Sequence, residues 1–253
     1  MKLHIDTAPI WESYQQQPCE CPLCLLETGV EAANVEYFLG ESVMEPDQRI
    51  EVNKTGFCAN HFKQMYAAGN RLGLALMTHT YMKETLTKLR KNAEAQRDSA
   101  ASEAGKPIFQ RMGTRKGSAM RGPAEQLRDM LNGCVLCERM RGTMERYVYT
   151  VIYMYRHEAE FPALFEKSQG VCLKHYAELL EMAPKHLSGD VLKRFVDTLT
   201  EVEIRNFERL ADEIEWFTKK FDYRNSDKPW GNSRDAVKRS VNKLRWYVVN
   251  DEE

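Results

Sequence analysis

The chain has 253 residues, a formal net charge of −1 and 29% charged residues. A chain of this length can bury a sizeable core, as one large domain or as two smaller ones. The balanced charge gives no overall bias toward nucleic acid or a membrane surface, so we expect neither as a partner. The first residues do not lead into an apolar run, and no apolar run approaches about 18 residues. We therefore expect no signal peptide, no membrane-spanning helix and a cytoplasmic location.

Helical periodicity is the main pattern along the chain. Apolar residues recur at three- and four-residue spacing after Leu25, and no comparable β-type alternation is present. The sequence therefore predicts an all-α fold. One predicted helix carries an inward stripe that consists of Leu72, Leu76, His79, Met82, Leu86 and Leu89. We interpret His79 as a core histidine rather than a metal ligand.

The order of the predicted elements repeats once, which indicates two pseudo-repeated helical units. The first repeat covers residues 1–98 and the second covers residues 124–221. Residues 99–123 contain four glycines, two prolines and five basic residues, which predicts an exposed basic linker. Residues 222–253 are predicted to form a C-terminal lid and helix that clamp the helical core.

The last predicted helix is basic and amphipathic. We expect its inward face to consist of Val237, Val241, Leu244 and Val248. Its basic residues are balanced by an acidic long helix earlier in the chain, which carries Glu201, Glu203, Glu208, Asp212, Glu213 and Glu215. An intramolecular contact between these two helices is the simplest interpretation.

Two copies of a cysteine and histidine pattern give the strongest chemical signal. Cys21-x-x-Cys24 is followed by Gly56-x-Cys58-x-x-His61, and Cys134-x-x-Cys137 is followed by Gly170-x-Cys172-x-x-His175. The two copies are offset by 113 residues at the first motif and by 114 at the second. A CxxC turn lets two thiolates reach one ion, and Cys-x-x-His at a helix start presents two ligands on one side. Each repeat is therefore predicted to hold a Cys3His metal site.

We predict that the ligands pair within each repeat, because the chain between the two motifs is long enough to leave and return. One predicted set is Cys21, Cys24, Cys58 and His61. The other predicted set is Cys134, Cys137, Cys172 and His175. Zinc is the expected metal, with two ions per chain, and an iron–sulfur cluster is the alternative. Cys19 stays open between a simple neighbour and an alternative ligand or redox-sensitive thiol.

Common catalytic motifs are absent from the sequence. It has no P-loop, no dinucleotide-binding glycine motif, no Gly-x-Ser-x-Gly elbow and no Glu-x-x-His di-iron signature. We therefore favour a non-enzymatic binding or scaffold module with two structural zinc sites and a protein partner. One alternative is a redox or metal sensor that uses the cysteine clusters. Another is a metalloenzyme with a pocket between the helical units, near His79 or Trp230.

The sequence also resembles a known family. The resemblance lies in the CPLC and GFCxxH elements of the first copy, the CxLC and GxCxxH elements of the second, and the stretch WFxxKFDYRN…PWGNS from Trp216 to Ser233. These residues are similar to a bacterial family of unknown function, domain-of-unknown-function family 6062. The resemblance spans almost the entire chain and implies one integrated unit. It implies no particular activity.

Overall fold

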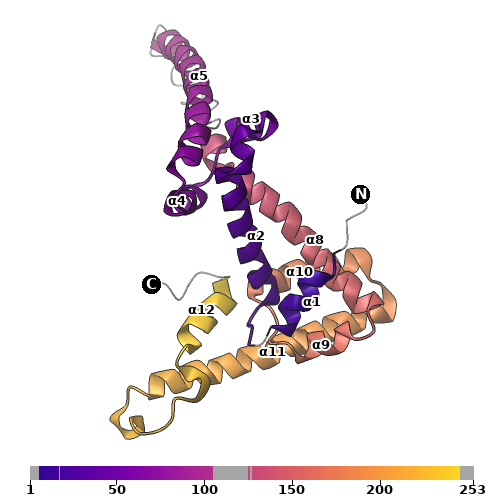
Figure 1. Ribbon diagram of the computed structural model, residues 1–253. Helices are drawn as coiled ribbons and strands as arrows, with labels where there is room; N and C mark the ends of the chain where they lie inside the picture. The colour runs from indigo at the N-terminus through magenta and orange to yellow at the C-terminus, as the bar shows by residue number, and fades with distance from the viewer. Residues whose placement is uncertain (1–5, 17, 105–124, 126, 246–253) are drawn as a thin grey trace. The chain divides into compact units, whose positions relative to one another are not determined.

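The computed structural model describes residues 6–16, 18–104, 125 and 127–245. All regular elements within these residues are helices, as Figure 1 shows, and the all-α fold class is confirmed. The α-helices are α1 (Ala8–Gln15), α2 (Pro22–Leu39), α3 (Pro46–Thr55), α4 (Ala59–Ala67), α5 (Arg71–Ala104), α8 (Val135–His157), α9 (Phe161–Lys167), α10 (Leu173–His186), α11 (Gly189–Lys219) and α12 (Ala236–Arg245). Three short 3-10 helices are η1 (Glu41–Met44), η2 (Tyr223–Asn225) and η3 (Gly231–Ser233). No helix in the described ranges is both long and apolar enough to cross a membrane.

The chain divides into two compact units that do not follow the order of the sequence. The first unit contains Met1–Val30 and Arg141–Glu253, and the second contains Glu31–Met140. Helices α2 and α8 each contribute residues to both units. The predicted repeats, 1–98 and 124–221, therefore do not coincide with the compact units, because each repeat supplies segments to both.

Aromatic side chains form the centre of the first unit. Tyr14, Phe161, Phe165 and Phe195 are fully buried, and the rings of Tyr14 and Phe161 meet edge to face with centroids 5.2 Å apart. Within this unit α11 packs against α9, α10 and α12, and α1 packs against α9. Buried aromatic rings contribute large apolar areas and prefer this edge-to-face geometry. The aromatic cluster therefore fixes how the short helices lie on α11.

The second unit is built on the packing of α3 against α5. Gly73 and Met77 of α5 are buried, and a Cβ at Gly73 would lie 2.1 Å from the backbone oxygen of Leu39. Only a glycine permits so close an approach, which determines the face of α5 that turns inward. The Arg49 guanidinium on α3 donates to the Leu76 carbonyl oxygen at 3.1 Å and thereby also fixes this face.

The apolar stripe predicted for this helix does not face inward. Leu72 is 71% exposed and Met82 is 65% exposed, while Leu86 and Leu89 are also exposed. His79 is exposed, so its interpretation as a core histidine is wrong. The predicted linker is also partly wrong, because residues 99–104 belong to α5. Residues 105–123 lie outside the described residues.

The inward face of α12 differs from the prediction. Val237 is 41% exposed and Leu244 is 48% exposed, whereas Ala236 and Lys243 are buried; Val248 lies outside the described residues. The physical reason is that the Lys243 ammonium has buried polar partners that a valine could not satisfy.

The predicted contact between the basic and acidic helices is present. The Arg239 guanidinium on α12 lies 2.6 Å from Glu213 on α11 and 3.0 Å from Glu20. Lys243 donates from Nζ to the carbonyl oxygens of Gln169 at 2.6 Å and Glu20 at 3.1 Å. Salt bridges between exposed groups contribute little, but these groups are mostly buried and belong to one network. The network therefore joins α12 to α11 and to the chain segments just before α2 and α10.

Replacing Lys243 by methionine should destabilise the first unit. Lys243 is 1% exposed, its Nζ lies 3.7 Å from the Glu203 carboxylate, and the variant would leave that carboxylate buried without its cation. Breaking a buried ion pair from one side costs about 3–5 kcal/mol. Urea denaturation of the variant measures this loss. The double variant Lys243→Met with Glu203→Gln is the control and should regain part of the stability; equal loss in both variants would contradict the ion-pair explanation.

Candidate metal centres

The eight predicted ligand residues gather into two groups of four. The group in the first unit consists of Cys21, Cys24, Cys172 and His175. The group in the second unit consists of Cys58, His61, Cys134 and Cys137. In each group the four candidate ligand atoms lie within 4.8 Å of one another. We call these the first and the second Cys3His group.

The predicted pairing of the motifs is wrong. Each Cys3His group combines the CxxC of one repeat with the Cys-x-x-His of the other. A helix of 18 residues such as α2 is about 27 Å long. After α2 the chain continues into η1, α3 and α4 of the second unit and does not return along α2 to Cys21. Two CxxC-to-CxxH connections of similar length in the sequence cannot distinguish this crossed pairing from a sequential one.

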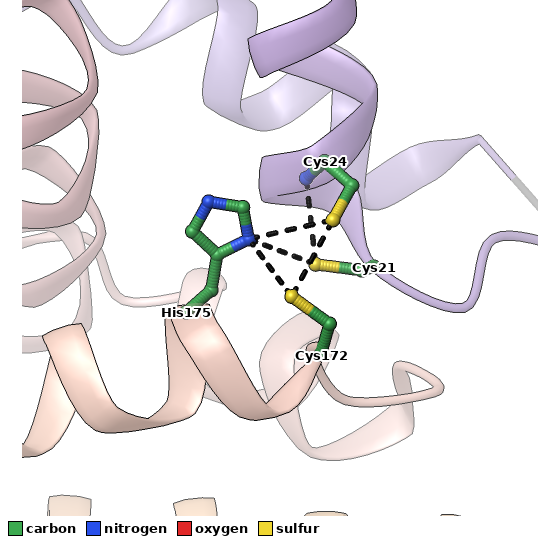
Figure 2. A group of neighbouring side chains, drawn as sticks. All are labelled: Cys21, Cys24, Cys172 and His175. Carbon is green, nitrogen blue, oxygen red and sulfur yellow. Dashed lines mark hydrogen bonds between the residues drawn. The ribbon is translucent and has the colours of Figure 1, made fainter. Parts of the chain in front are cut away.

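The first Cys3His group has the shape of a single-ion site. Figure 2 shows the His175 imidazole with its Nδ1 atom directed at the three sulfur atoms. Nδ1 lies 3.3 Å from the sulfur of Cys21, 3.5 Å from that of Cys24 and 3.3 Å from that of Cys172. The sulfurs of Cys24 and Cys172 are 3.5 Å apart. All four residues are buried.

The second Cys3His group repeats this arrangement with more exposure. The His61 Nδ1 atom lies 3.3 Å from the Cys58 sulfur, 3.2 Å from the Cys134 sulfur and 3.4 Å from the Cys137 sulfur. The sulfurs of Cys58 and Cys137 are 3.9 Å apart. Cys58 and Cys137 are partly exposed, whereas the other two residues are buried.

The local backbone explains why these motifs present their ligands. Cys58 and Cys172 are the N-cap residues of α4 and α10, where the helix dipole stabilises thiolate charge. In the CxxC turn of the first group, the Cys24 backbone N–H donates to the Cys21 sulfur at 3.4 Å. Gly170 has φ 75°, and a Cβ there would lie 2.5 Å from Oε2 of Glu203. The glycine two residues before Cys172 is therefore required by both backbone conformation and space.

Two carboxylates on α2 orient the two histidines, and the sequence reasoning missed both. Glu27 Oε2 lies 3.4 Å from Nε2 of His175, and Glu31 Oε1 lies 3.0 Å from Nε2 of His61. A carboxylate on one imidazole nitrogen fixes the ring so that the other nitrogen can bind a metal. A signal was present in the sequence, since the two glutamates are four residues apart and follow the first CxxC.

In the first group, hydrogen bonds shift the pKa values of the ligand side chains in opposite directions. Burial lowers the pKa of His175, but bonds with Cys172, Cys21 and Glu27 outweigh it and raise that pKa to about 12. Bonds from Cys21 and Cys24 hold the pKa of the Cys172 thiol well below its usual range. The pKa of Cys24 is raised far above its usual range by hydrogen bonding with Cys172 and Cys21.

The pKa values of the ligand side chains in the second group are shifted in the same way. Burial lowers the pKa of His61, but hydrogen bonds with Cys134 and Glu31 outweigh this effect and raise that pKa to about 10. Burial raises the pKa of Cys134, yet bonds with His61 and with the Cys137 backbone N–H bring it down to about 6. Burial and the bond with Cys134 raise the pKa of Cys137 above its usual range. Each group thus contains a histidine whose pKa is raised beside a thiol whose pKa is lowered, His175 with Cys172 and His61 with Cys134.

The residues present fit a tetrahedral zinc ion. With metal–sulfur bonds of about 2.3 Å, tetrahedral geometry places two sulfur ligands about 3.8 Å apart. The measured sulfur separations are 3.5 Å in the first group and 3.9 Å in the second. Bound there, zinc would supply a structural cross-link between the two chain segments. The thiols and the histidine Nδ1 would be its four ligands in each group.

A cavity of about 290 Å³ adjoins the first Cys3His group. Cys21 and Cys24 line it together with Cys19 and residues of α12, whereas His79 and Trp230 do not. Cys19 is not a member of either group of ligand atoms. Burial raises the pKa of its thiol to about 11, which keeps the thiol protonated and argues against Cys19 as a ready ligand.

Glu27→Gln and Glu31→Gln form a matched pair that tests the roles of these carboxylates. Glu27→Gln should weaken zinc binding at the first group, and Glu31→Gln should weaken it at the second, by about 10–100-fold each. Chelator competition that resolves two binding events per chain measures the effect. Each variant is the control for the other, because the unaffected group should keep its affinity. A loss at both groups in either variant would contradict the one-carboxylate, one-histidine assignment.

Zinc binding should release protons and weaken as the pH falls. Zinc binds thiolates and neutral imidazole. The raised pKa values of His175 and Cys24 leave both protonated at neutral pH, as are His61 and Cys137 in the second group. Each ion should therefore displace at least two protons, and affinity should fall from about pH 8 to about pH 6. Calorimetric titration in buffers of different ionisation enthalpy counts these protons; release of less than one per ion would contradict the assignment.

Comparison with known proteins gives a family and nothing more specific. The family model described as a family of unknown function, DUF6062, matches residues 1–251. No curated protein and no solved structure matches the chain. Because the match covers nearly the whole sequence, both Cys3His groups lie inside it. The chain belongs to the DUF6062 family.

Proposed function

We propose that this protein is a non-enzymatic helical scaffold in which each Cys3His group holds one structural zinc ion and whose surface binds another protein. The observation that carries the proposal is the convergence of three sulfurs and one Nδ1 atom within 4.8 Å in both groups. A zinc site with four protein ligands has no open position for water or substrate, which is the mark of a structural site.

The spacing of the ligand atoms favours a single ion over an iron–sulfur cluster. A cluster contains several iron atoms and bridging sulfides, so its ligands surround a wider object than one ion. Separations of 3.2–3.5 Å between Nδ1 and the sulfurs suit ligands that share one metal atom. The redox-sensor alternative also loses support from Cys19, because the thiol is only partly exposed and its pKa is raised to about 11.

The structural role follows from the position of the ligands in the chain. Cys21 and His175 are 154 residues apart, and His61 and Cys134 are 73 residues apart. A cross-link between distant segments removes much of the freedom of the unfolded chain. Structural zinc binding contributes about 10–16 kcal/mol, which is comparable to the whole stability of a domain. Zinc would therefore decide whether each unit stays folded.

Reduced cysteines are a condition of this proposal. All seven cysteines are free thiols in the structure. Thiols persist in the reducing cytoplasm, whereas disulfides form in oxidising compartments. A cytoplasmic location is therefore part of the proposal.

Metal analysis of anaerobically purified protein tests the zinc assignment. We expect about two zinc ions per chain, about one in Cys172→Ser and about one in Cys58→Ser, because each substitution disables a different group. A brown protein with visible charge-transfer absorption and bound iron would overturn the zinc assignment. Circular dichroism tests the structural role, since removal of zinc should lower helicity and the melting temperature. A verified metal-free sample with unchanged helicity and melting temperature would contradict that role.

A further inference from the structure

Helix α5 has two faces with different roles. One face packs in the second unit, where Gly73 and Met77 are buried, and Arg49 of α3 donates to Thr80 Oγ1 at 3.4 Å. Further along, Lys88 donates from Nζ to the carbonyl oxygens of Asn53 and Lys54, both at 3.4 Å. These contacts fix the rotation of α5 about its own axis. They leave its opposite face toward solvent.

The opposite face is apolar and has a heptad repeat. We call it the α5 stripe; it consists of Leu72, Ala75, His79, Met82, Leu86, Leu89 and Ala93. Successive members are separated by three or four residues in alternation, which is the 3.5-residue repeat of helices that pack side by side. The first six are exposed and Ala93 is partly exposed. Scattered apolar residues on a surface need no explanation, but a contiguous row at this spacing marks an interaction site.

The shape of α5 favours a helical occupant. Figure 1 shows the C-terminal part of α5 continuing beyond α3. The helix has 34 residues and is therefore about 51 Å long. A long, straight and narrow apolar row fits the side of another helix, since knobs-into-holes packing needs such a row on both partners.

Charge along the stripe identifies the chemistry of that occupant. Lys83 and Arg90 directly follow the stripe members Met82 and Leu89, and Arg97 holds the equivalent position one heptad later, after Gln96. The three cations therefore line one edge of the stripe. All three are exposed, and within the described residues none has a salt bridge or side-chain hydrogen bond. The other edge carries neutral residues, including Thr78, Thr85 and Asn92. Residues at the edges of such a stripe choose the partner by charge.

A second copy of the chain is a poor match for this pattern. In an antiparallel pair, the edge with Lys83, Arg90 and Arg97 would face the same cations of the other copy. In a parallel pair, these cations would face neutral residues such as Thr85 and gain no ion pair. An acidic partner helix would satisfy the exposed cations in either orientation.

We infer that the α5 stripe binds an amphipathic partner helix whose apolar heptad row is flanked by glutamate or aspartate. The inference rests on the proposed function as a scaffold and names the class of its partner. The apolar residues supply the affinity, and Lys83, Arg90 and Arg97 select the acidic helix. Such binding should weaken with added salt because the selecting charges are exposed.

Designed peptides test this inference on the full-length, zinc-loaded protein. One 28-residue peptide carries leucine at both apolar heptad positions and glutamate at both edge positions; the matched peptide carries lysine at the edge positions. Repulsion between like edges keeps each peptide from pairing with itself at neutral pH. Fluorescence anisotropy should show binding of the acidic peptide at least tenfold tighter than binding of the basic peptide.

Substitutions on the stripe locate the binding. Met82→Gln with Leu86→Gln should weaken the acidic peptide about tenfold or more, because two apolar side chains are lost from the contact. Both residues are exposed, so the fold should be unaffected. Ile204→Gln on α11 is the matched control, since Ile204 is also an exposed apolar residue and should leave binding unchanged.

Any of three peptide-binding results would overturn the inference. These are no binding of the acidic peptide, equal binding of the basic peptide, and binding that the stripe substitutions do not weaken. Dimerisation of the protein that the stripe substitutions abolish would also overturn it, in favour of a second copy. Zinc content measured on the same sample decides the proposed function separately, so the two failures can be told apart.

Discussion

The structure depends on the convergence of a CxxC turn and a Cys-x-x-His helix start that are far apart in the sequence. In the first group these are the start of α2 and the start of α10, and in the second they are the start of α8 and the start of α4. Thiolates gathered this closely repel one another unless a cation compensates them. Without metal, a histidine whose pKa is raised by its sulfur neighbours supplies part of that compensation. A bound zinc ion would offset two of the three thiolate charges of each group.

The two copies of the motif are not equivalent, because helix α2 alone supplies the carboxylates that contact both histidines. Glu27 and Glu31 lie three and seven residues after the second cysteine of the first CxxC. The corresponding positions after Cys137 hold Met140 and Met144, which are buried apolar residues. Helix α2 therefore supplies orienting carboxylates to both Cys3His groups, while the equivalent turn of α8 is given to core packing. The ligand motif therefore occurs twice in the sequence, whereas the carboxylates that orient the histidines follow only the first CxxC.

The sequence predicts the features that depend on local patterns of residues. It does not predict the features that depend on how distant segments pack against one another. Helical periodicity identified the all-α class, and motif spacing selected the residues that form the two groups. The pairing of the CxxC and Cys-x-x-His motifs could not be predicted, because Cys21 could meet Cys58 or Cys172 at a similar entropic cost of loop closure. Periodicity also finds an apolar stripe without saying whether it faces the core. Here Gly73 turned the opposite face of α5 inward, and buried polar partners for Lys243 outweighed the apolar pattern of α12.

The second unit contains both the exposed α5 stripe and the second Cys3His group. Among the described residues of this unit, the fully buried large side chains include Phe38, Met65, Met77 and Leu136. A structural metal ion adds its binding free energy to the stability that the core provides. If zinc adds stability through Cys58, His61, Cys134 and Cys137, the exposed residues of the α5 stripe are not needed for folding. They can then remain on the surface for recognition. A metal cross-link in the second unit is thus consistent with an α5 stripe that stays exposed.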